Sequence, residues 1–432
     1  MTTKDTIDAP ETSSAARARL VARLRESRER LIEIARTLVR APSGNPPGDT
    51  RAVAEAAAGI LSADGIEVEL APSQPPIVNL IARVRAHRPG RRLVYNGHLD
   101  TYPIGDPARW SVDPLAGILK GARLYGRGAV DMKGGIAASM LAALLLAEMR
   151  NDWAGEVIVT LAGDEETMGT HGTQFLLERF PEAHGDAMIT GDAGSPDVIR
   201  FGEKGMIWVD LTAEGKAAHG AHVHLGVNAI ERLMTALADV FRLRGLPVAL
   251  PAEVARAIET AAPVSEKISG KGESDTLRSL TVNCGVFHGG TLRNIMPAEA
   301  TATLDLRLPA GVTIRDIEER LARILAHHDG VHFRIGRRFE PLWSDPQHEI
   351  VVHLQRAGRE VLGRTPVTNY RVGGSDARLY RERKVPAYVC GLTPHNMGAP
   401  DEYVDVDELY AVAYMHTLAG FDYLTRPSVA RE

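Results

Sequence analysis

Several short apolar runs in this chain have the composition of β-strands and lead directly into residues that can bind a metal ion. Residues 92–96 (Arg-Leu-Val-Tyr-Asn) precede Gly-His-Leu-Asp at 97–100, and residues 156–161 (Glu-Val-Ile-Val-Thr-Leu) precede Gly-Asp-Glu-Glu at 163–166. In open α/β sheets, ligands bind in the crevice at the carboxyl ends of the strands. The chain is therefore predicted to fold around a sheet that brings these segments to one edge.

Residues of the same kind occur elsewhere in the chain. The strand-like run 187–190 leads to Asp192, the run 388–391 leads to His395, and Gly-Ala-Val-Asp-Met-Lys-Gly-Gly at 128–135 lies between the first two motifs. The predicted metal ligands are His98, Asp131, Glu166, Asp192 and His395, with Glu165 beside them.

This set of side chains suits two divalent metal ions. Imidazole and carboxylate ligands together favour zinc, with cobalt or manganese as alternatives. We expect Asp131 to bridge the ions, with His98 and Asp192 completing one site. Glu166 and His395 would complete the other. The carboxylates of the set then leave one excess positive charge, which a bridging hydroxide cancels; paired metals about 3.5–4 Å apart generate that nucleophile near neutral pH.

Glu165 adjoins a predicted ligand, and in a turn its carboxylate can point the other way and take a proton from water as a general base. Each feature also has a purely structural interpretation. His98 and Asp100 could form a hydrogen-bonded pair, and Asp131 could cap a helix. Glu165 and Glu166 could simply favour the positive N-terminus of a helix.

The motifs resemble those of a known family. Gly-His-Leu-Asp-Thr at 97–101, Gly-Arg-Gly-Ala-Val-Asp-Met-Lys-Gly-Gly at 126–135 and Asp-Glu-Glu at 164–166 are similar to those of the zinc-dependent carboxypeptidase G, acetylornithine deacetylase, succinyl-diaminopimelate desuccinylase and aminoacylase family of metallopeptidases. The resemblance runs from about residue 31 to about residue 423. It includes the segment 218–230, which is typical of the lid domain of that family.

The resemblance implies the same site: one zinc on His98, Asp131 and Asp192, a second on Asp131, Glu166 and His395, Glu165 as general base, and Asp100 orienting His98. Two departures stand out. Several members of the family have Glu where this chain has Asp192, although other members share the Asp. His395 is separated from Asp401-Glu402 by five residues, which is more than the usual few.

The resemblance also implies residues that bind the substrate. His219 and Asn294 would reach across a dimer interface to the substrate carbonyl, where a polarising donor stabilises the oxyanion. Arg307 and Arg378 would anchor a substrate carboxylate, because a guanidinium binds a carboxylate bidentately. The alternatives are a solvated histidine loop for His219 and an ion pair at the surface for either arginine.

Strands alternate with helices up to Asp192, which predicts an α/β fold with a mostly parallel sheet covered by helices on both faces. The resemblance makes this a zinc-exopeptidase-like catalytic domain. The spacing of apolar residues predicts one helix at 15–39 and, further along, helices at 51–63, 136–147, 350–361 and 406–424 and strands near 66–70 and 77–84.

From residue 203 the pattern changes. Strands are predicted at 206–214, 280–286, 300–308 and 331–339, with helices at 228–243 and 314–327. This βαββαβ order predicts an inserted ferredoxin-like α+β domain, which serves as lid and dimerisation domain. Residues 247–276 are predicted to add a surface helix plus a loop. The predicted domains are 1–202 and 341–432 (catalytic) and 203–340 (lid).

The composition fits a soluble protein long enough for two domains, with 432 residues, 44% hydrophobic and 24% charged. The net charge of −5 indicates no nucleic-acid or membrane partner. Cys284 and Cys390 are too few for a disulfide framework, so buried reduced thiols are expected. Residues 1–14 are polar, with disorder expected and no export segment. The turn at 126–128 lacks the acidic partner of a dinucleotide site. We expect a cytoplasmic protein.

The sequence predicts a dinuclear metal-dependent amidohydrolase that acts on an N-acyl amino acid or a related small amide, with Glu165 as base and a homodimer as the assembly. A dipeptidase or carboxypeptidase, or a hydrolase of another carbon–nitrogen bond in a catabolic pathway, would use the same atoms. A metal-retaining scaffold without turnover is the alternative from a different class, and the intact Glu165 argues against it.

Overall fold

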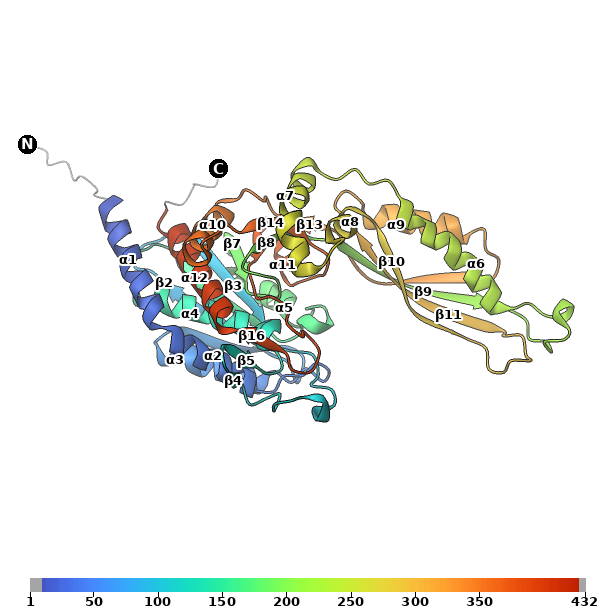
Figure 1. Cartoon of the computed structure of the whole chain (residues 1–432), viewed down its shortest axis with the longest axis horizontal. Helices are drawn as coiled ribbons and strands as arrows, with labels where there is room; N and C mark the ends of the chain where they lie inside the picture. Colours follow the sequence, from blue (N-terminus) through green and yellow to red (C-terminus); the bar gives the residue numbers. More distant parts are fainter. Residues whose placement is uncertain (1–9, 427–432) are drawn as a thin grey trace, which may run out of the picture. The chain divides into compact units, whose positions relative to one another are not determined.

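The computed structural model describes residues 10–426 (Figure 1), so most of the segment predicted to be disordered, residues 1–14, lies outside the described residues. The chain divides into two compact units. The first comprises the residues up to Phe201 together with Ser344–Asn369 and the residues from Ser375 on, and the second comprises Gly202–Trp343 and Tyr370–Gly374. The short return of residues 370–374 to the second unit was not part of the predicted division.

The largest sheet has nine strands in the order β1-β2-β6-β3-β7-β15-β8-β13, with β14 paired to β8. Its centre is parallel, because β3 pairs in parallel with β6 and β7, and β7 pairs in parallel with β15. The flanking strands are antiparallel. The strands are β1 (Glu67–Pro72), β2 (Val78–Arg85), β3 (Arg92–His98), β6 (Glu156–Ala162), β7 (Ala187–Thr190), β8 (Val198–Glu203), β13 (Leu342–Trp343), β14 (Val367–Arg371) and β15 (Ala387–Val389).

Helices cover both faces of this sheet, as predicted. Successive side chains of a strand point to opposite faces. Val94 of β3 packs in a cluster with residues of α5 (Thr173–Arg179) and α11 (Ala377–Glu382). The next residue, Tyr95, donates a hydrogen bond of 2.7 Å to the His416 carbonyl of α12 on the other side. The remaining helices of this unit are α1 (Pro10–Glu26), α2 (Arg28–Arg40), α3 (Arg51–Ala63), α4 (Gly134–Glu148), α10 (Glu349–Leu362) and α12 (Val406–Leu424).

Two local predictions need correction, and one element was not predicted. The single helix predicted at 15–39 is two helices, because the chain turns at Ser27, whose hydroxyl donates to the Arg23 carbonyl at 2.7 Å. The segment 247–276 holds two helices, α7 (Ala252–Ser269) and α8 (Glu273–Arg278), and not one helix plus a loop. A small three-stranded sheet was not predicted; it consists of β4 (Ile118–Lys120), β5 (Arg123–Tyr125) and β16 (Tyr403–Asp405).

The second unit has the predicted βαββαβ order and is called the lid below. Its antiparallel sheet has the order β10-β11-β9-β12, and Figure 1 shows the helices α6 and α9 along one face of that sheet. The elements are β9 (Gly205–Glu214), α6 (Ala229–Phe241), β10 (Thr281–Gly289), β11 (Glu299–Leu308), α9 (Ile314–Leu325) and β12 (Val331–Phe339). Of the two thiols, Cys390 is buried, whereas Cys284 on the edge strand β10 is only half-buried.

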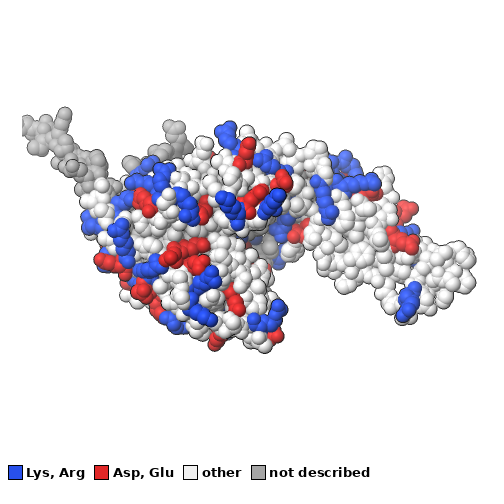
Figure 2. All heavy atoms as spheres, in the orientation of Figure 1, with Lys and Arg blue, Asp and Glu red and all other residues white. Residues whose placement is uncertain are grey.

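The segment Ala129–Glu148 is apolar and long enough to cross a membrane by length and composition alone, but its most apolar window is 100% buried in the protein. It contains α4, which packs against α12, α2 and the sheet. A helix that is apolar on all sides is typical of a protein core. On the face drawn in Figure 2, acidic and basic side chains are interspersed without a continuous patch of one sign.

The start of α4 lies against the end of β7, and this contact requires glycine. A Cβ atom on Gly135 would lie 2.0 Å from the Gly191 carbonyl oxygen, which is backbone and has little freedom to shift. The contact fixes the segment that carries Asp131 against the segment that carries Asp192.

Gly135→Ala is therefore expected to lower the free energy of unfolding by about 2–3 kcal/mol, the cost typical of overpacking a core. The matched control is Gly59→Ala in α3, where a Cβ atom meets nothing within 4 Å; it should be neutral or stabilising by up to about 1 kcal/mol. Denaturant unfolding measures both values, and equal stability of the two variants would contradict the tight packing of α4 on β7.

Candidate metal centre

Three predicted ligands come together at the carboxyl edge of the parallel strands. His98 ends β3, Glu166 lies in the turn after the neighbouring strand β6, and Asp131 lies in the turn before α4. One ligand atom of each lies within 4.8 Å of the others, and His98 Nε2 is 3.1 Å from Asp131 Oδ1. This is the arrangement that the spacing of the motifs predicts.

Asp100 is completely buried and holds two parts of the site together. Its Oδ1 and Oδ2 atoms accept hydrogen bonds of 3.1 Å from the backbone N–H groups of Glu165 and Glu166. Asn45 donates a further bond of 2.9 Å to Oδ2. His98 Nδ1 lies 2.9 Å from the Asp100 carbonyl oxygen and 3.7 Å from the carboxylate. The backbone carbonyl therefore orients the imidazole, and the carboxylate orients the acidic turn.

A residue that sequence analysis did not select, Glu402, fixes the segment that carries Asp131. Its Oε1 atom accepts hydrogen bonds from the backbone N–H groups of Val130 at 3.0 Å and Asp131 at 3.3 Å. Its Oε2 atom accepts from the guanidinium of Arg127. Glu402 is 1% exposed, so this clamp is part of the interior.

The electrostatics of the cluster favour a cation. Removal from water raises the pKa of Glu166 to about 8, with further contributions from the charges of Asp131 and Asp100, although His98 opposes the shift. The pKa of Glu165 is also raised well above its usual range, first by removal from water. Burial alone would lower the pKa of His98, but the hydrogen bond and charge of Asp131 raise it well above the usual value. Crowded carboxylates of this kind are the setting in which a bound metal ion is the dominant local charge.

One carboxylate oxygen of the cluster is also available to coordinate a metal ion. Glu166 Oε1 is inaccessible to solvent and accepts no hydrogen bond from the described residues. An unpaired buried carboxylate oxygen is costly. One imidazole and two carboxylates form a donor set that suits zinc and related divalent ions. The residues present therefore fit a divalent metal ion.

Asp192 and Glu165 lie at the same edge of the sheet. Asp192 follows β7 and is 4% exposed. Its charge contributes to the raised pKa of Glu165, after removal from water and the charge of Asp376. Asp192 is thus within electrostatic reach of Glu165, although its oxygens are not among the atoms that meet within 4.8 Å around His98.

The structure does not bring His395 to this group. Its imidazole stacks on the Tyr403 ring at 4.6 Å between centroids, and Nε2 lies 3.6 Å from Asp405 Oδ2. His395, Asp405 and Glu408 form a separate group. The long connection to Glu402 explains this, because it folds back so that the Tyr403 N–H meets the His395 carbonyl at 3.4 Å. His395 as a metal ligand stays a prediction, and its position does not support it.

Arg378 lies beside the acidic turn and is not at the surface. It is 7% exposed, and its Nη2 atom donates a hydrogen bond of 2.7 Å to the Met168 carbonyl. Its neighbour Asp376 accepts a bond of 2.6 Å from Thr173, and burial raises the pKa of Asp376 to about 6. The surface ion pair considered for Arg378 is therefore excluded.

The lid residues predicted to bind substrate, His219, Asn294 and Arg307, differ in their surroundings. His219 and Asn294 lie together, since His219 forms an isolated bridge with Ile295 and Gly220 N–H donates to the Asn294 carbonyl at 2.7 Å. Both side chains are exposed. Arg307 on β11 instead forms an ion pair with Asp305 at 2.9 Å, as one alternative predicted.

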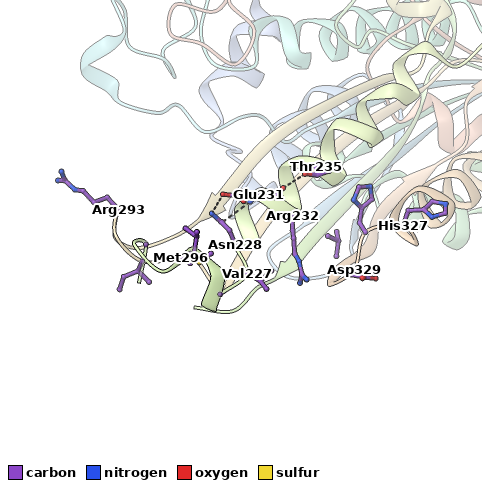
Figure 3. A pocket seen from close by; sticks show the side chains of 15 residues that line it. Val227, Asn228, Glu231, Arg232, Thr235, Arg293, Met296, His327 and Asp329 are labelled. Atoms are coloured by element: carbon purple, nitrogen blue, oxygen red, sulfur yellow. Dashed lines mark hydrogen bonds between the residues drawn. The ribbon is translucent and has the colours of Figure 1, made fainter. Parts of the chain in front are cut away.

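The lid also contains a pocket of about 700 Å³ near these residues (Figure 3), lined entirely by lid side chains. Asn228 and Glu231 meet within it, but Asn228 is occupied as the N-cap of α6, where it accepts from the N–H groups of Ile230 and Glu231. The pocket contains no group of clustered metal ligands among the described residues.

Comparison with known proteins identifies the family. A family model described as peptidase family M20/M25/M40 matches residues 94–419. The chain belongs to this family. It is 32% identical over 404 residues to the succinyl-diaminopimelate desuccinylase of Methylobacterium sp. (strain 4-46), covering 88% of this chain and 93% of that protein. The corresponding enzyme of Gluconacetobacter diazotrophicus is 31% identical, with 90% and 97% covered. The protein is therefore a metal-dependent hydrolase of amide bonds.

Solved structures share the fold. An M20 family metallo-carboxypeptidase from Sulfolobus solfataricus matches with a TM-score of 0.74 at 20% identity, covering 92% of this chain and 98% of that one. Human carnosine dipeptidase 1 matches with a TM-score of 0.70 at 16% identity, covering 95% and 99%. A Bacillus subtilis M20 protein described as a dinuclear metal binding peptidase matches with a TM-score of 0.64 at 18% identity, covering 93% and 99%. These likenesses confirm the predicted α/β architecture with an inserted lid.

Proposed function

We propose that this chain is a dinuclear metal-dependent amidohydrolase that removes the acyl group from an N-acyl amino acid. The observation that carries the proposal is the group of His98, Asp131 and Glu166 at the carboxyl edge of the parallel strands, with Glu165 next to it. The relatives named as succinyl-diaminopimelate desuccinylases favour an acyl group that carries its own carboxylate.

In this proposal His98, Asp131 and Asp192 would hold one divalent ion, and Asp131 and Glu166 would hold a second. Zinc suits these ligands best, with cobalt or manganese as alternatives. When bound, the ions supply Lewis-acid polarisation of the scissile carbonyl and lower the pKa of a water molecule.

The residues of the chain then move the proton. Glu165 takes it from water as the new C–O bond forms, and delivers it to the nitrogen of the leaving amine as the C–N bond breaks. Its backbone N–H is fixed by Asp100, which keeps the carboxylate in place between the two transfers. A non-catalytic scaffold would have no need of this base.

The remaining contacts in the proposal come from the lid and from Arg378 of the first unit. His219 and Asn294 from the partner subunit donate to the substrate carbonyl, and Arg307 and Arg378 bind carboxylates of the substrate. The lid carries exposed apolar side chains that support a homodimer, among them Val223 (64% exposed) and Leu292 (62% exposed). Large exposed apolar patches mark association sites in soluble proteins.

The proposal also includes the cellular location and a second candidate reaction. A cytoplasmic location is supported by the mild net charge of −5 and by a longest apolar helix that is buried in the core.

Peptidase activity would use the same residues, and it is the second candidate. The peptidases among the structural neighbours are at most 20% identical to this chain, so their likeness supports the fold alone.

Glu165→Gln is expected to reduce kcat at least about a hundredfold and to leave the metal content unchanged, because the amide keeps the shape of the side chain but accepts no proton. The assay is a panel of N-acetyl, N-succinyl, N-formyl and N-carbamoyl amino acids and dipeptides, with added zinc, cobalt or manganese. Glu178→Gln, an exposed position on α5, is the matched control. Near-parental turnover by Glu165→Gln would reassign the base, and hydrolysis of dipeptides alone would favour the second candidate.

The proposed dimer is tested by complementation. His219→Ala and Glu165→Gln should each be nearly inactive alone, with loss of the oxyanion donor costing roughly a hundredfold. Because each active centre would combine two chains, a mixed dimer contains one centre with both residues intact. Verified heterodimers should therefore recover about half of the parental activity. Absence of recovery, or a monomer in solution, would contradict a contribution of His219 to the partner's centre.

A further inference from the structure

Tyr102 lies on the solvent-facing side of the metal-binding group. Its hydroxyl is within hydrogen-bond reach of the Glu166 carboxylate, and it is close enough to Asp131 and Glu165 to feel their charges as well. The side chain is 42% exposed, whereas His98 is 2% and Asp131 8% exposed. Tyr102 is therefore easier for a molecule arriving from solvent to reach than His98 or Asp131.

The backbone around Tyr102 holds the ring in place. Both backbone polar groups of the preceding residue, Thr101, form hydrogen bonds. Its N–H donates to the Ser43 carbonyl at 3.0 Å, and its carbonyl accepts from the Asn45 N–H at 2.8 Å. Gly398 lies against the other side of the ring, and a Cβ atom there would be 3.5 Å from a ring carbon. Gly398 has a φ of +72°, a conformation that disfavours any larger residue.

The carboxylates of Glu166, Asp131 and Glu165 lie near the Tyr102 hydroxyl. His395 does not belong to this group, because it stacks on Tyr403 in a separate group. A carboxylate that binds a metal ion gives up lone pairs that would otherwise accept hydrogen bonds. The Tyr102 hydroxyl, held next to that carboxylate, then has an O–H to donate to another oxygen in the same place.

We propose that Tyr102 is a catalytic residue that donates a hydrogen bond from its hydroxyl to the carbonyl oxygen of the substrate as that oxygen becomes an oxyanion. This inference rests on the proposed function. The phenol keeps its proton throughout, so no covalent bond to Tyr102 forms or breaks. Donors aimed at the developing oxyanion lower the barrier more than they strengthen substrate binding. Unlike His219, Tyr102 would act within its own chain.

The first test compares Tyr102→Phe with a matched control, Tyr125→Phe, in the zinc-loaded full-length protein. Tyr125 is a half-buried tyrosine on β5 whose ring meets Tyr403 at 5.3 Å. Tyr102→Phe should lower kcat by about tenfold to a hundredfold with little change in KM, the pattern of an interaction made in the transition state. Tyr125→Phe should keep parental values. Unchanged kcat in Tyr102→Phe would overturn the proposal.

The second test separates this role from metal binding and does not need turnover. Tyr102→Phe should retain the parental zinc content by elemental analysis, and addition of zinc to the parent should produce no tyrosinate absorption. A phosphinate analogue of an N-succinyl amino acid, whose P–O⁻ group mimics the tetrahedral oxyanion, should bind Tyr102→Phe about tenfold or more weakly by calorimetry. Lost zinc, a tyrosinate signal or equal phosphinate affinity would each contradict the proposal.

These readings also keep the two proposals apart. A parent that hydrolyses no amide of the panel would count against the proposed function. The phosphinate comparison would still decide whether Tyr102 is a donor, because it measures binding to the zinc-loaded site and not turnover.

Discussion

Carboxyl groups withdrawn from water at one edge of a parallel sheet are the constraint on which the rest of this structure depends. Each carries a cost unless a donor or a cation compensates it. The interior supplies donors for some of them. Asp100 accepts hydrogen bonds from two backbone N–H groups and from the Asn45 amide. His98 lies within hydrogen-bond distance of Asp131. Glu402 forms an ion pair with Arg127 and accepts hydrogen bonds from two backbone N–H groups.

Glu166 is a member of this set that the interior satisfies only in part. Its Oε1 atom accepts no hydrogen bond from the described residues, and its pKa is raised to about 8, first by removal from water. A divalent cation would compensate this carboxylate and its neighbours at once. The fold thus builds a rigid, negatively charged edge from backbone contacts such as Gly135 against Gly191, and metal binding and proton transfer both follow from that edge.

Much of this could be predicted from sequence because it follows from local patterns. Apolar runs that end in His98 or in Asp164-Glu165-Glu166 define both a strand and its functional end, so β3, β6 and their shared edge were predictable. The βαββαβ order of the lid was predictable for the same reason. Contacts between segments that are distant in the sequence could not be predicted. The clamp of Glu402 on Asp131 joins residues 271 positions apart, and no local pattern reports it.

The positions of individual site residues also depend on contacts between distant segments. A histidine near the end of β15 matched the expected ligand pattern, but the fold of the chain between His395 and Glu402 decides where the imidazole lies, and it lies on Tyr403. Asp100 was expected to orient His98, and its backbone carbonyl oxygen lies 2.9 Å from His98 Nδ1. Sequence analysis did not predict that the Asp100 carboxylate binds the backbone N–H groups of Glu165 and Glu166, because a neighbouring strand end supplies these groups.

The central claim is that the cluster around His98 binds divalent metal ions. The most direct measurement is anomalous X-ray diffraction at the zinc absorption edge from crystals of the zinc-loaded protein. The account predicts one peak of anomalous density beside His98 Nε2, Asp131 and Asp192, and a second beside Asp131 and Glu166. Zinc bound only at His395, Asp405 and Glu408, or no zinc at His98, would contradict it.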